Sequence, residues 1–141
     1  MSVVLHSLQP VVLKKRNLLK KFIHELFMKE GKSLRSLGII FCTDKYLLEI
    51  NKKHLQHDYY TDIITFDLSD STSSQITGEL YISVDRVKDN SLTLHTKFSN
   101  ELLRVIFHGS LHLCGYQDKS EKDINIMRQK EDKYLTLFTS L

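Results

Sequence analysis

Apolar side chains recur three and four positions apart along much of this chain. A period of 3.6 residues per turn gathers such positions on one face of a helix. The pattern predicts helices over four segments, residues 12–29, 43–54, 98–113 and 120–138. Thr43 or Asp44 is suited to cap the second of these helices. Ser120 stands three residues before Asp123 at the start of the fourth, a spacing that resembles a capping box.

Shorter runs of β-branched and aromatic residues lie between the helical segments. Such residues fit the pleated, half-buried surface of a sheet. They predict four strands, at residues 3–8, 37–42, 61–66 and 76–84. Residues 69–75 are rich in Ser and Thr and are expected to form a loop, and Asp85 is suited to cap a fifth helix. The expected fold is therefore α+β (mixed α/β), with about four strands and four to five helices.

The segment at residues 98–113 has almost no polar face after Arg104. A helix that is apolar nearly all round is expected at the centre of a fold, covered by other elements. We therefore expect this helix to be central and largely buried. His108 and His112 lie on it, and buried imidazoles need polar partners or an ion.

Length and composition are those of one ordinary globular domain spanning residues 1–141. Of the 141 residues, 41% are hydrophobic and 26% are charged. No apolar run approaches the roughly 18 residues of a membrane span, and the first residues lack the basic segment of a secretory signal. The two cysteines, Cys42 and Cys114, form no disulfide framework, which favours a reducing compartment. We expect a cytoplasmic protein without a membrane partner.

The formal net charge is +3, which is compatible with an anionic partner but predicts little alone. Basic residues gather near the start of the first helical segment: Lys14, Lys15, Arg16, Lys20 and Lys21. Such a cluster is more often a solvated surface than a binding site. It is still the best candidate in this sequence for a basic patch that contacts RNA.

The most informative chemistry lies in and just after the central helix. His108 and His112 are four residues apart, so both imidazoles can point at one ion from the same face. Gly115 can end the helix in a left-handed conformation and let the chain turn back toward that ion with Asp118. Three protein ligands leave a fourth position for water, as in catalytic zinc sites. A lone pair of histidines would be weak support, but the full spacing in a nearly apolar helix predicts a metal site.

The spacing of this site matches the metzincin peptidase motif H-E-x-x-H-x-x-G-x-x-H at all but two positions. Gly109 stands where those peptidases carry the glutamate that acts as general base, and Asp118 replaces the third histidine. A bound metal can still activate water and polarise a phosphoryl oxygen without that glutamate, which favours phosphodiester hydrolysis over peptide cleavage. Gly109 could instead allow a strand or a substrate to approach the helix closely. An aspartate ligand shifts metal preference somewhat toward harder metals.

The residues of this motif resemble the bacterial YbeY endoribonucleases, which are rRNA maturation factors. Their signature is H-G-x-L-H-L-x-G-Y-x-H, and residues 108–118 read H-G-S-L-H-L-C-G-Y-Q-D. Upstream, Asn51 and residues 61–66 are similar to the family's L-N and T-D-V-L-S-F segments. Residues 78–83 are similar to its G-D/E-I-x-I-S strand, and residues 101–105 resemble the run before the first histidine.

This resemblance implies a zinc-dependent, single-strand-specific endoribonuclease. Such proteins act in maturation of the 3′ end of small-subunit rRNA and in ribosome quality control, so ribosomal RNA and the small ribosomal subunit are the implied partners. The family's three zinc positions fall on His108, His112 and Asp118, which would hold one zinc ion and its reactive water. With Asp118 in place of the usual histidine, another divalent metal is also possible. A family arginine is replaced by Leu55, for which a neighbouring basic residue could substitute.

Several other residues can be weighed for a role at the site against an ordinary structural one. Glu79 could assist as a base or position water, and Asp62 could orient a ligand histidine or simply end a strand. Cys114 lies between the ligands, but its spacing favours packing on the far side of the helix. His57, like His54 and His95, is expected at the surface.

Two further hypotheses remain open at this stage. One is a zinc metallohydrolase that acts on protein or a small molecule, as the metzincin-like spacing suggests and Gly109 opposes. The other is a ribosome-binding factor in which the metal only holds the structure. No protein partner is indicated by the sequence.

Overall fold

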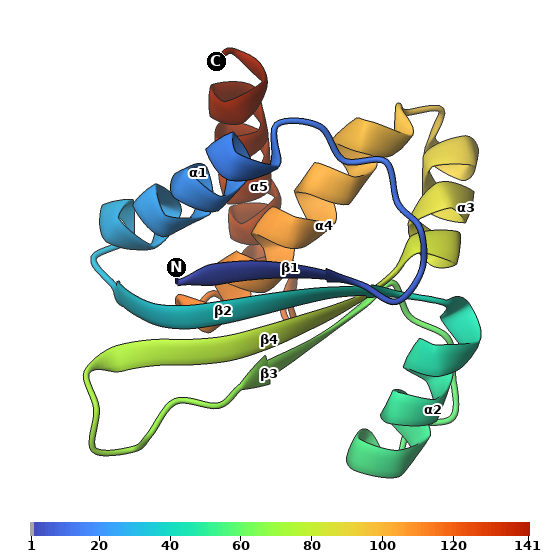
Figure 1. Cartoon of the computed structure of the whole chain (residues 1–141), viewed down its shortest axis with the longest axis horizontal. Helices are drawn as coiled ribbons and strands as arrows, with labels where there is room; N and C mark the ends of the chain where they lie inside the picture. Colours follow the sequence, from blue (N-terminus) through green and yellow to red (C-terminus); the bar gives the residue numbers. More distant parts are fainter. Residues whose placement is uncertain (1) are drawn as a thin grey trace.

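The computed structural model describes residues 2–141 and contains four strands and five helices within that range (Figure 1). In chain order the elements are β1 (Val3–Ser7), α1 (Arg16–Lys29), β2 (Ser33–Cys42), α2 (Asp44–Leu55), β3 (Ile63–Asp67), β4 (Gln75–Ser83), α3 (Val84–Leu94), α4 (Phe98–Leu113) and α5 (Glu121–Thr139). The α+β fold expected from the sequence is confirmed. None of the helices in the described range is both long and apolar enough to cross a membrane.

The four strands form one mixed sheet in the order β1-β2-β4-β3. Strands β1, β2 and β4 run parallel to one another, and β3 pairs antiparallel with β4 at the edge. Helices α1, α4 and α5 cover one face of this sheet, and α2 lies on the other side (Figure 1). A large apolar core fills the space beneath the first group of helices, and a small cluster of Cys42, Leu47 and Ile64 lies under α2.

Hydroxyl side chains cap three of the helices. The Thr43 hydroxyl accepts a hydrogen bond from the Tyr46 amide, and the Ser120 hydroxyl accepts one from the Asp123 amide. These two caps confirm the expectations from sequence. The expected cap at Asp85 is wrong, because the Ser83 side chain caps α3 and Asp85 lies in its first turn. The Asp85 carboxylate instead accepts from the backbone amide of Asp44.

Two element boundaries also differ from the sequence prediction. Helix α1 begins at Arg16 rather than at residue 12, because Lys15 at its N-cap has a left-handed backbone with φ of 57°. Leu13 packs against the core from the irregular segment that precedes the helix. Strand β2 begins at Ser33, four residues before the apolar run, because its polar first half still pairs with β4.

Helix α4 is the central helix of the fold, as its composition predicted. It packs against α5, α3, α1 and strands β3 and β4. Ten of its 16 residues are buried, including Leu102, Ile106, Phe107 and Leu111. Burial of that much apolar surface fixes the helix on the sheet and therefore fixes the direction of every side chain that it carries.

Gly109 and Gly78 allow α4 to lie close to the sheet. A Cβ atom at Gly109 would come within 2.7 Å of Ile63 and 2.8 Å of Leu80. One at Gly78 would come within 2.6 Å of Leu113. The residue after the first histidine is therefore a packing glycine pressed against β3 and β4. The sequence left open whether a strand or a substrate approaches Gly109 closely. In the structure, strands β3 and β4 do so.

We expect Gly109→Ala to lower the free energy of unfolding by about 1–3 kcal/mol, because the new methyl group overpacks the contact with Ile63 and Leu80. This loss outweighs the gain of up to about 1 kcal/mol that alanine brings to a helix interior. Gly38→Ala is the matched control, since a Cβ there meets no atom closer than 3.6 Å. Urea denaturation of both variants measures the difference; equal stability of the two would contradict the packing role of Gly109.

Candidate metal centre

His108 and His112 lie one turn apart on α4 and face the same region of space. Their ring centroids are 4.5 Å apart, and the ring planes are nearly perpendicular. Both side chains are partly exposed, although the helix that carries them is mostly buried. The two imidazoles thus project from the core helix into an accessible site, as their four-residue spacing predicted.

Asp118 reaches this site from the turn that follows α4. Gly115 begins the return with φ of 108°, a conformation that glycine adopts without strain. The turn brings the Asp118 Oδ2 atom within 3.2 Å of His112 Nε2 and 3.4 Å of His108 Nε2. Helix α4, Gly115 and Asp118 thus bring the two imidazoles and the carboxylate together, as expected from the sequence.

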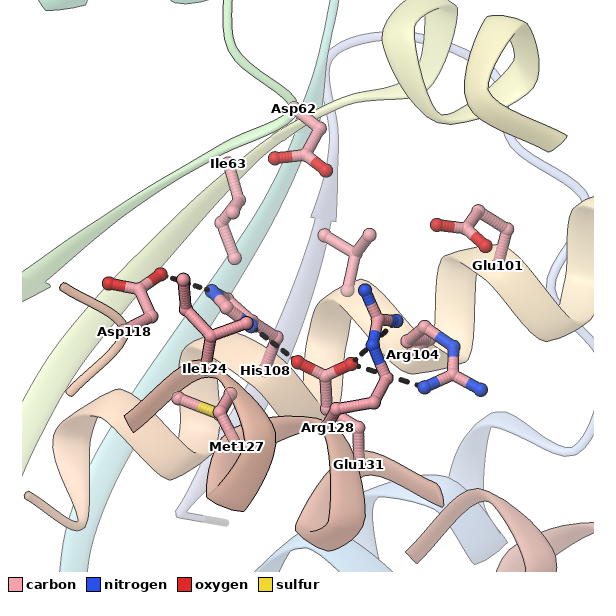
Figure 2. Close-up of a pocket in the computed structure, with 11 residues that line it drawn as sticks. Asp62, Ile63, Glu101, Arg104, His108, Asp118, Ile124, Met127, Arg128 and Glu131 are labelled. Atoms are coloured by element: carbon pink, nitrogen blue, oxygen red, sulfur yellow. Dashed lines mark hydrogen bonds and ion pairs between the residues drawn. The ribbon is translucent and has the colours of Figure 1, made fainter. Parts of the chain in front are cut away.

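The second ring nitrogen of each histidine is held by an acceptor. The Nδ1 atom of His112 lies 2.8 Å from the carbonyl oxygen of Tyr116. The Nδ1 atom of His108 lies 2.6 Å from Glu131 Oε2 (Figure 2). A carbonyl or carboxylate oxygen can only accept, so each Nδ1 carries a proton, and in the neutral imidazole each Nε2 then offers its lone pair to the site. Acceptors of this kind commonly orient metal-binding histidines.

Glu131, on α5, is held in place by three donors. Besides His108, Arg104 and Arg128 donate to its Oε1 atom at 3.1 and 3.2 Å. The Glu131 side chain is only 5% exposed, and a buried carboxylate requires such partners. Arg104 is in turn paired with Asp132 at 2.7 Å. Glu131 is thus a fixed anion behind His108, and it joins the two helices at the site.

The three candidate ligands have the spacing that a tetrahedral ion needs. Their donor atoms all lie within 4.8 Å of one another. In a tetrahedral zinc site with bonds of about 2.0–2.1 Å, neighbouring ligand atoms are about 3.3 Å apart. The distances of 3.2 and 3.4 Å from Asp118 to the two imidazoles match that separation. Two oriented imidazoles and a carboxylate are also a suitable donor set for zinc, so His108, His112 and Asp118 fit a metal ion.

A groove passes over these three residues and widens on either side of them. On one side, a pocket of about 350 Å³ extends over α4 and α5, where Arg104, Arg128 and Glu131 line it (Figure 2). On the other, a pocket of about 750 Å³ extends beneath the connection between α2 and β3. His108 and Asp118 belong to both pockets. His108, His112 and Asp118 form the metal group. This group therefore lies in the middle of an extended depression rather than in a closed cavity.

Burial and charge alter the protonation of several groups in the groove. Burial disfavours the charged form of His108, but its hydrogen bond to Glu131 and the nearby carboxylates outweigh this, so the pKa of His108 lies above its usual value. Burial raises the pKa of Asp62, although the charge of His108 opposes that rise. Burial also raises the pKa of Glu101. The raised pKa values of Asp62 and Glu101 thus belong to carboxyl groups that line the same pocket as His108.

The other residues considered from the sequence differ in where they lie relative to the metal group. Asp62 lines both pockets immediately before β3, but its carboxylate accepts from Asn90, and the partner of His108 is Glu131. Cys114 is buried in the main core, which confirms its packing on the far side of the helix. His54, His57 and His95 are all exposed, as expected.

Glu79 is not brought to the metal group. Its neighbours Gly78 and Leu80 face α4, so the alternation of a strand directs Glu79 to the opposite face of the sheet. There the Tyr81 hydroxyl donates to Glu79 Oε1 at 3.2 Å. The supporting role expected for Glu79 therefore lacks a structural basis.

The cluster of basic residues on and before α1 lies away from the metal group. Lys14 and Lys15 line a small pocket with Ser99 and Asn100 at the start of α4. His108 and His112 lie toward the other end of that helix, roughly 12–20 Å further along its axis for a rise of 1.5 Å per residue. An RNA-contacting role for this cluster stays a prediction.

Sequence reasoning missed Glu131, although the sequence contains a signal for it. The buried residues of α5 are Met127, Glu131, Tyr134 and Phe138, so the glutamate interrupts the apolar stripe of the helix. A charged residue at a position that faces the core is informative because it needs a buried partner. The identity of that partner depends on how two helices pack and could not be read from the spacing.

Comparisons with known proteins agree on one family. A sequence-family model described as "Endoribonuclease YbeY" matches residues 9–139. The chain is 47% identical to an endoribonuclease YbeY of Cytophaga hutchinsonii over 89% of its length and 87% of that protein. It is 46% identical to one of Flavobacterium psychrophilum over 83% of its length and 82% of the relative. The solution structure of TM1509 from Thermotoga maritima superposes with a TM-score of 0.65 at 28% identity, covering 96% of this chain and 89% of that one.

We expect Glu131→Gln to weaken zinc binding by about 10- to 100-fold, because the neutral amide holds the His108 ring less firmly and lowers its basicity. Competition with a chromogenic chelator measures this affinity directly. Asp132→Asn is the matched control, since Asp132 is the next residue and pairs with Arg104 but does not contact His108. If both variants bound zinc as tightly as the wild type, Glu131 would not orient the ligand.

Proposed function

The chain belongs to the YbeY endoribonuclease family, and on that premise we propose that it is a metal-dependent endoribonuclease for single-stranded RNA. Its physiological substrate is ribosomal RNA, with the small ribosomal subunit as partner and the 3′ end of the small-subunit rRNA as the processed region. The work is done in the cytoplasm, where that RNA matures. One zinc ion is the proposed cofactor, held by His108, His112 and Asp118.

The observation that carries this proposal is the group of two oriented imidazoles and one carboxylate in an open groove. Both Nε2 atoms face Asp118, and both Nδ1 atoms are engaged by acceptors. When bound, a zinc ion supplies a Lewis acid for a phosphoryl oxygen and lowers the pKa of bound water. The three side chains leave room for a further ligand on the exposed side of the site, where Asp118 is 42% exposed.

The remaining residues of the groove hold this group and receive an extended substrate. Glu131 fixes the ring of His108, and the Tyr116 carbonyl fixes that of His112. Arg104 and Arg128 line the groove over α4 and α5, where their guanidinium groups suit a polyanion. Pockets on both sides of the metal group match a chain that continues in both directions from the bond to be cut, as in an endonuclease.

The position of Gly109 disfavours a peptidase of the metzincin type. In those enzymes the residue after the first histidine is a glutamate that activates water. Here a Cβ at that position would lie within 2.7 Å of Ile63 and 2.8 Å of Leu80, so the position faces the sheet and has no room for a glutamate side chain unless both residues shift. A general base could not be presented from this position, so the shared spacing does not extend to shared chemistry.

Cleavage of unstructured RNA tests the proposed activity. We expect the purified protein to cut a single-stranded RNA internally, to lose this activity with a zinc chelator, and to regain it when zinc is returned. His112→Ala is expected to reduce the rate by at least about 100-fold, since it removes one of three ligands. His24→Ala is the control, because His24 lies on α1 outside the groove. A protein that bound ribosomal subunits but cut no RNA with any metal would instead be a binding factor.

Metal content tests the ligand set separately from activity. Asp118→Ala is expected to lose most of its zinc after dialysis, because two imidazoles alone bind the ion weakly. Asp89→Ala, which removes an exposed carboxylate of α3, is expected to retain the wild-type content. Elemental analysis of the dialysed proteins provides the measurement. Retention of zinc in the Asp118 variant would remove this residue from the site.

A further inference from the structure

The connection between α2 and β3 presents an aromatic pair at the edge of the groove. The rings of His57 and Tyr59 are stacked, with centroids 5.1 Å apart and planes 21° from parallel. The Tyr59 hydroxyl and His57 Nδ1 are also hydrogen-bonded at 2.9 Å. Two contacts therefore hold these side chains together as a flat unit, although both are exposed.

Hydrogen bonds to the buried residue Asn51 hold this connection in place. The Asn51 side chain is almost fully buried, and its amide donates to the Tyr59 carbonyl at 2.9 Å. The backbone carbonyl of Asn51 accepts a hydrogen bond from the backbone amide of His57 at 3.1 Å. Gln56 ends α2 in a left-handed conformation just before the pair. The backbone on both sides of Asp58 is thus anchored to one buried residue, which preorganises the aromatic pair in the absence of a ligand.

The anchored pair lines the same pocket as the metal group. His57 and Tyr59 line it together with His108, His112 and Asp118. Lys119, the residue after Asp118, also lines this pocket and adds a positive charge. A chain seated on the metal group therefore passes Tyr59 as it leaves the groove on this side.

Tyr59 differs from its neighbour Tyr60 in what surrounds the ring. The two side chains are similarly exposed, at 56% and 54%. The guanidinium of Arg86 lies over the Tyr60 ring at 5.1 Å, and Tyr60 does not line the groove. His57 stacks on one face of the Tyr59 ring, and much of the remaining ring surface is exposed where Tyr59 lines the pocket. Unpaired bases stack on such surfaces with little regard to sequence.

We propose that Tyr59, backed by His57, is a stacking platform for a base of single-stranded RNA that flanks the bond to be cut. This inference rests on the proposed endoribonuclease function and adds to it a subsite and a source of strand selectivity. A base in a duplex already has both faces covered by its neighbours, whereas an unpaired base can lay one face on Tyr59. The platform thus favours single strands without reading their sequence.

The chain contains no tryptophan, so a tryptophan placed at this site is a specific reporter. We expect the fluorescence of Tyr59→Trp to be quenched when the zinc-loaded protein is mixed with oligoadenylate of about ten nucleotides, recorded by stopped flow before cleavage. The same RNA annealed to its complement is expected to cause little change. Tyr60→Trp is the control and is expected to respond to neither. Equal responses of the two reporters, or none from either, would overturn the proposal.

Binding and cleavage by a second set of variants provide an independent test. Tyr59→Ala is expected to raise KM for the oligonucleotide about tenfold and to leave kcat within about twofold, because stacking is a binding interaction remote from the metal. Tyr59→Phe, which keeps the ring, and Tyr60→Ala are both expected to remain within about twofold of the wild type. An unchanged KM in Tyr59→Ala would contradict the stacking role.

Failure of this inference is distinguishable from failure of the proposed function. If the wild-type protein cuts RNA and Tyr59→Ala does so with the same KM, only the platform is refuted. If the wild-type protein cuts no RNA, the function fails, yet the fluorescence of Tyr59→Trp still shows whether single strands stack at this position. Zinc content of the Tyr59 variants, expected to equal that of the wild type, excludes an indirect effect through the metal group.

Discussion

The close contact between α4 and the sheet is the constraint on which the site depends. At Gly109 the helix lies directly on Ile63 and Leu80, and its apolar residues fill the core around that point. A helix so placed cannot rotate without exposing apolar surface or creating clashes. The direction of His108 and His112 is therefore determined by the packing of residues that do no chemistry. The glycine that separates this motif from the zincins is also the residue that allows this contact.

A second constraint connects the core to the electrostatics of the site. Placing Glu131 on the buried face of α5 is unfavourable unless its charge is compensated. Arg104, Arg128 and His108 supply that compensation, so folding of α5 against α4 and orientation of a ligand histidine occur together. The same carboxylate that would destabilise an apolar interface thereby becomes a structural part of the metal group. This explains why the two helices meet through a polar cluster at their otherwise apolar junction.

Local features of the sequence predicted much of this structure. The helical period located α4 and α5, hydroxyl residues marked two caps, and the spacing of His108, His112 and Asp118 identified residues that do meet in space. Features that depend on packing between distant segments were not accessible. Glu131 lies 23 residues from His108. Glu79 was associated with the site because the sequence alone does not show which face of β4 packs against α4. The start of α1 was misplaced because the left-handed backbone of Lys15, which ends the preceding segment, leaves no mark in the pattern of apolar residues.

The nearest buried carboxylate to the metal group also bears on the reaction. Glu131 could be considered a substitute for the glutamate that the zincins place after the first histidine. Both of its oxygens, however, already accept hydrogen bonds, from Arg104 and Arg128 at Oε1 and from His108 at Oε2. It also contacts the Nδ1 side of His108, away from the Nε2 atoms that face Asp118. Glu131 is thus suited to hold a ligand rather than to take a proton from water. Under the proposed function, the reactivity of this site would come from the bound ion, and a phosphodiester, whose charged oxygens bind a metal directly, suits such a site better than a peptide bond.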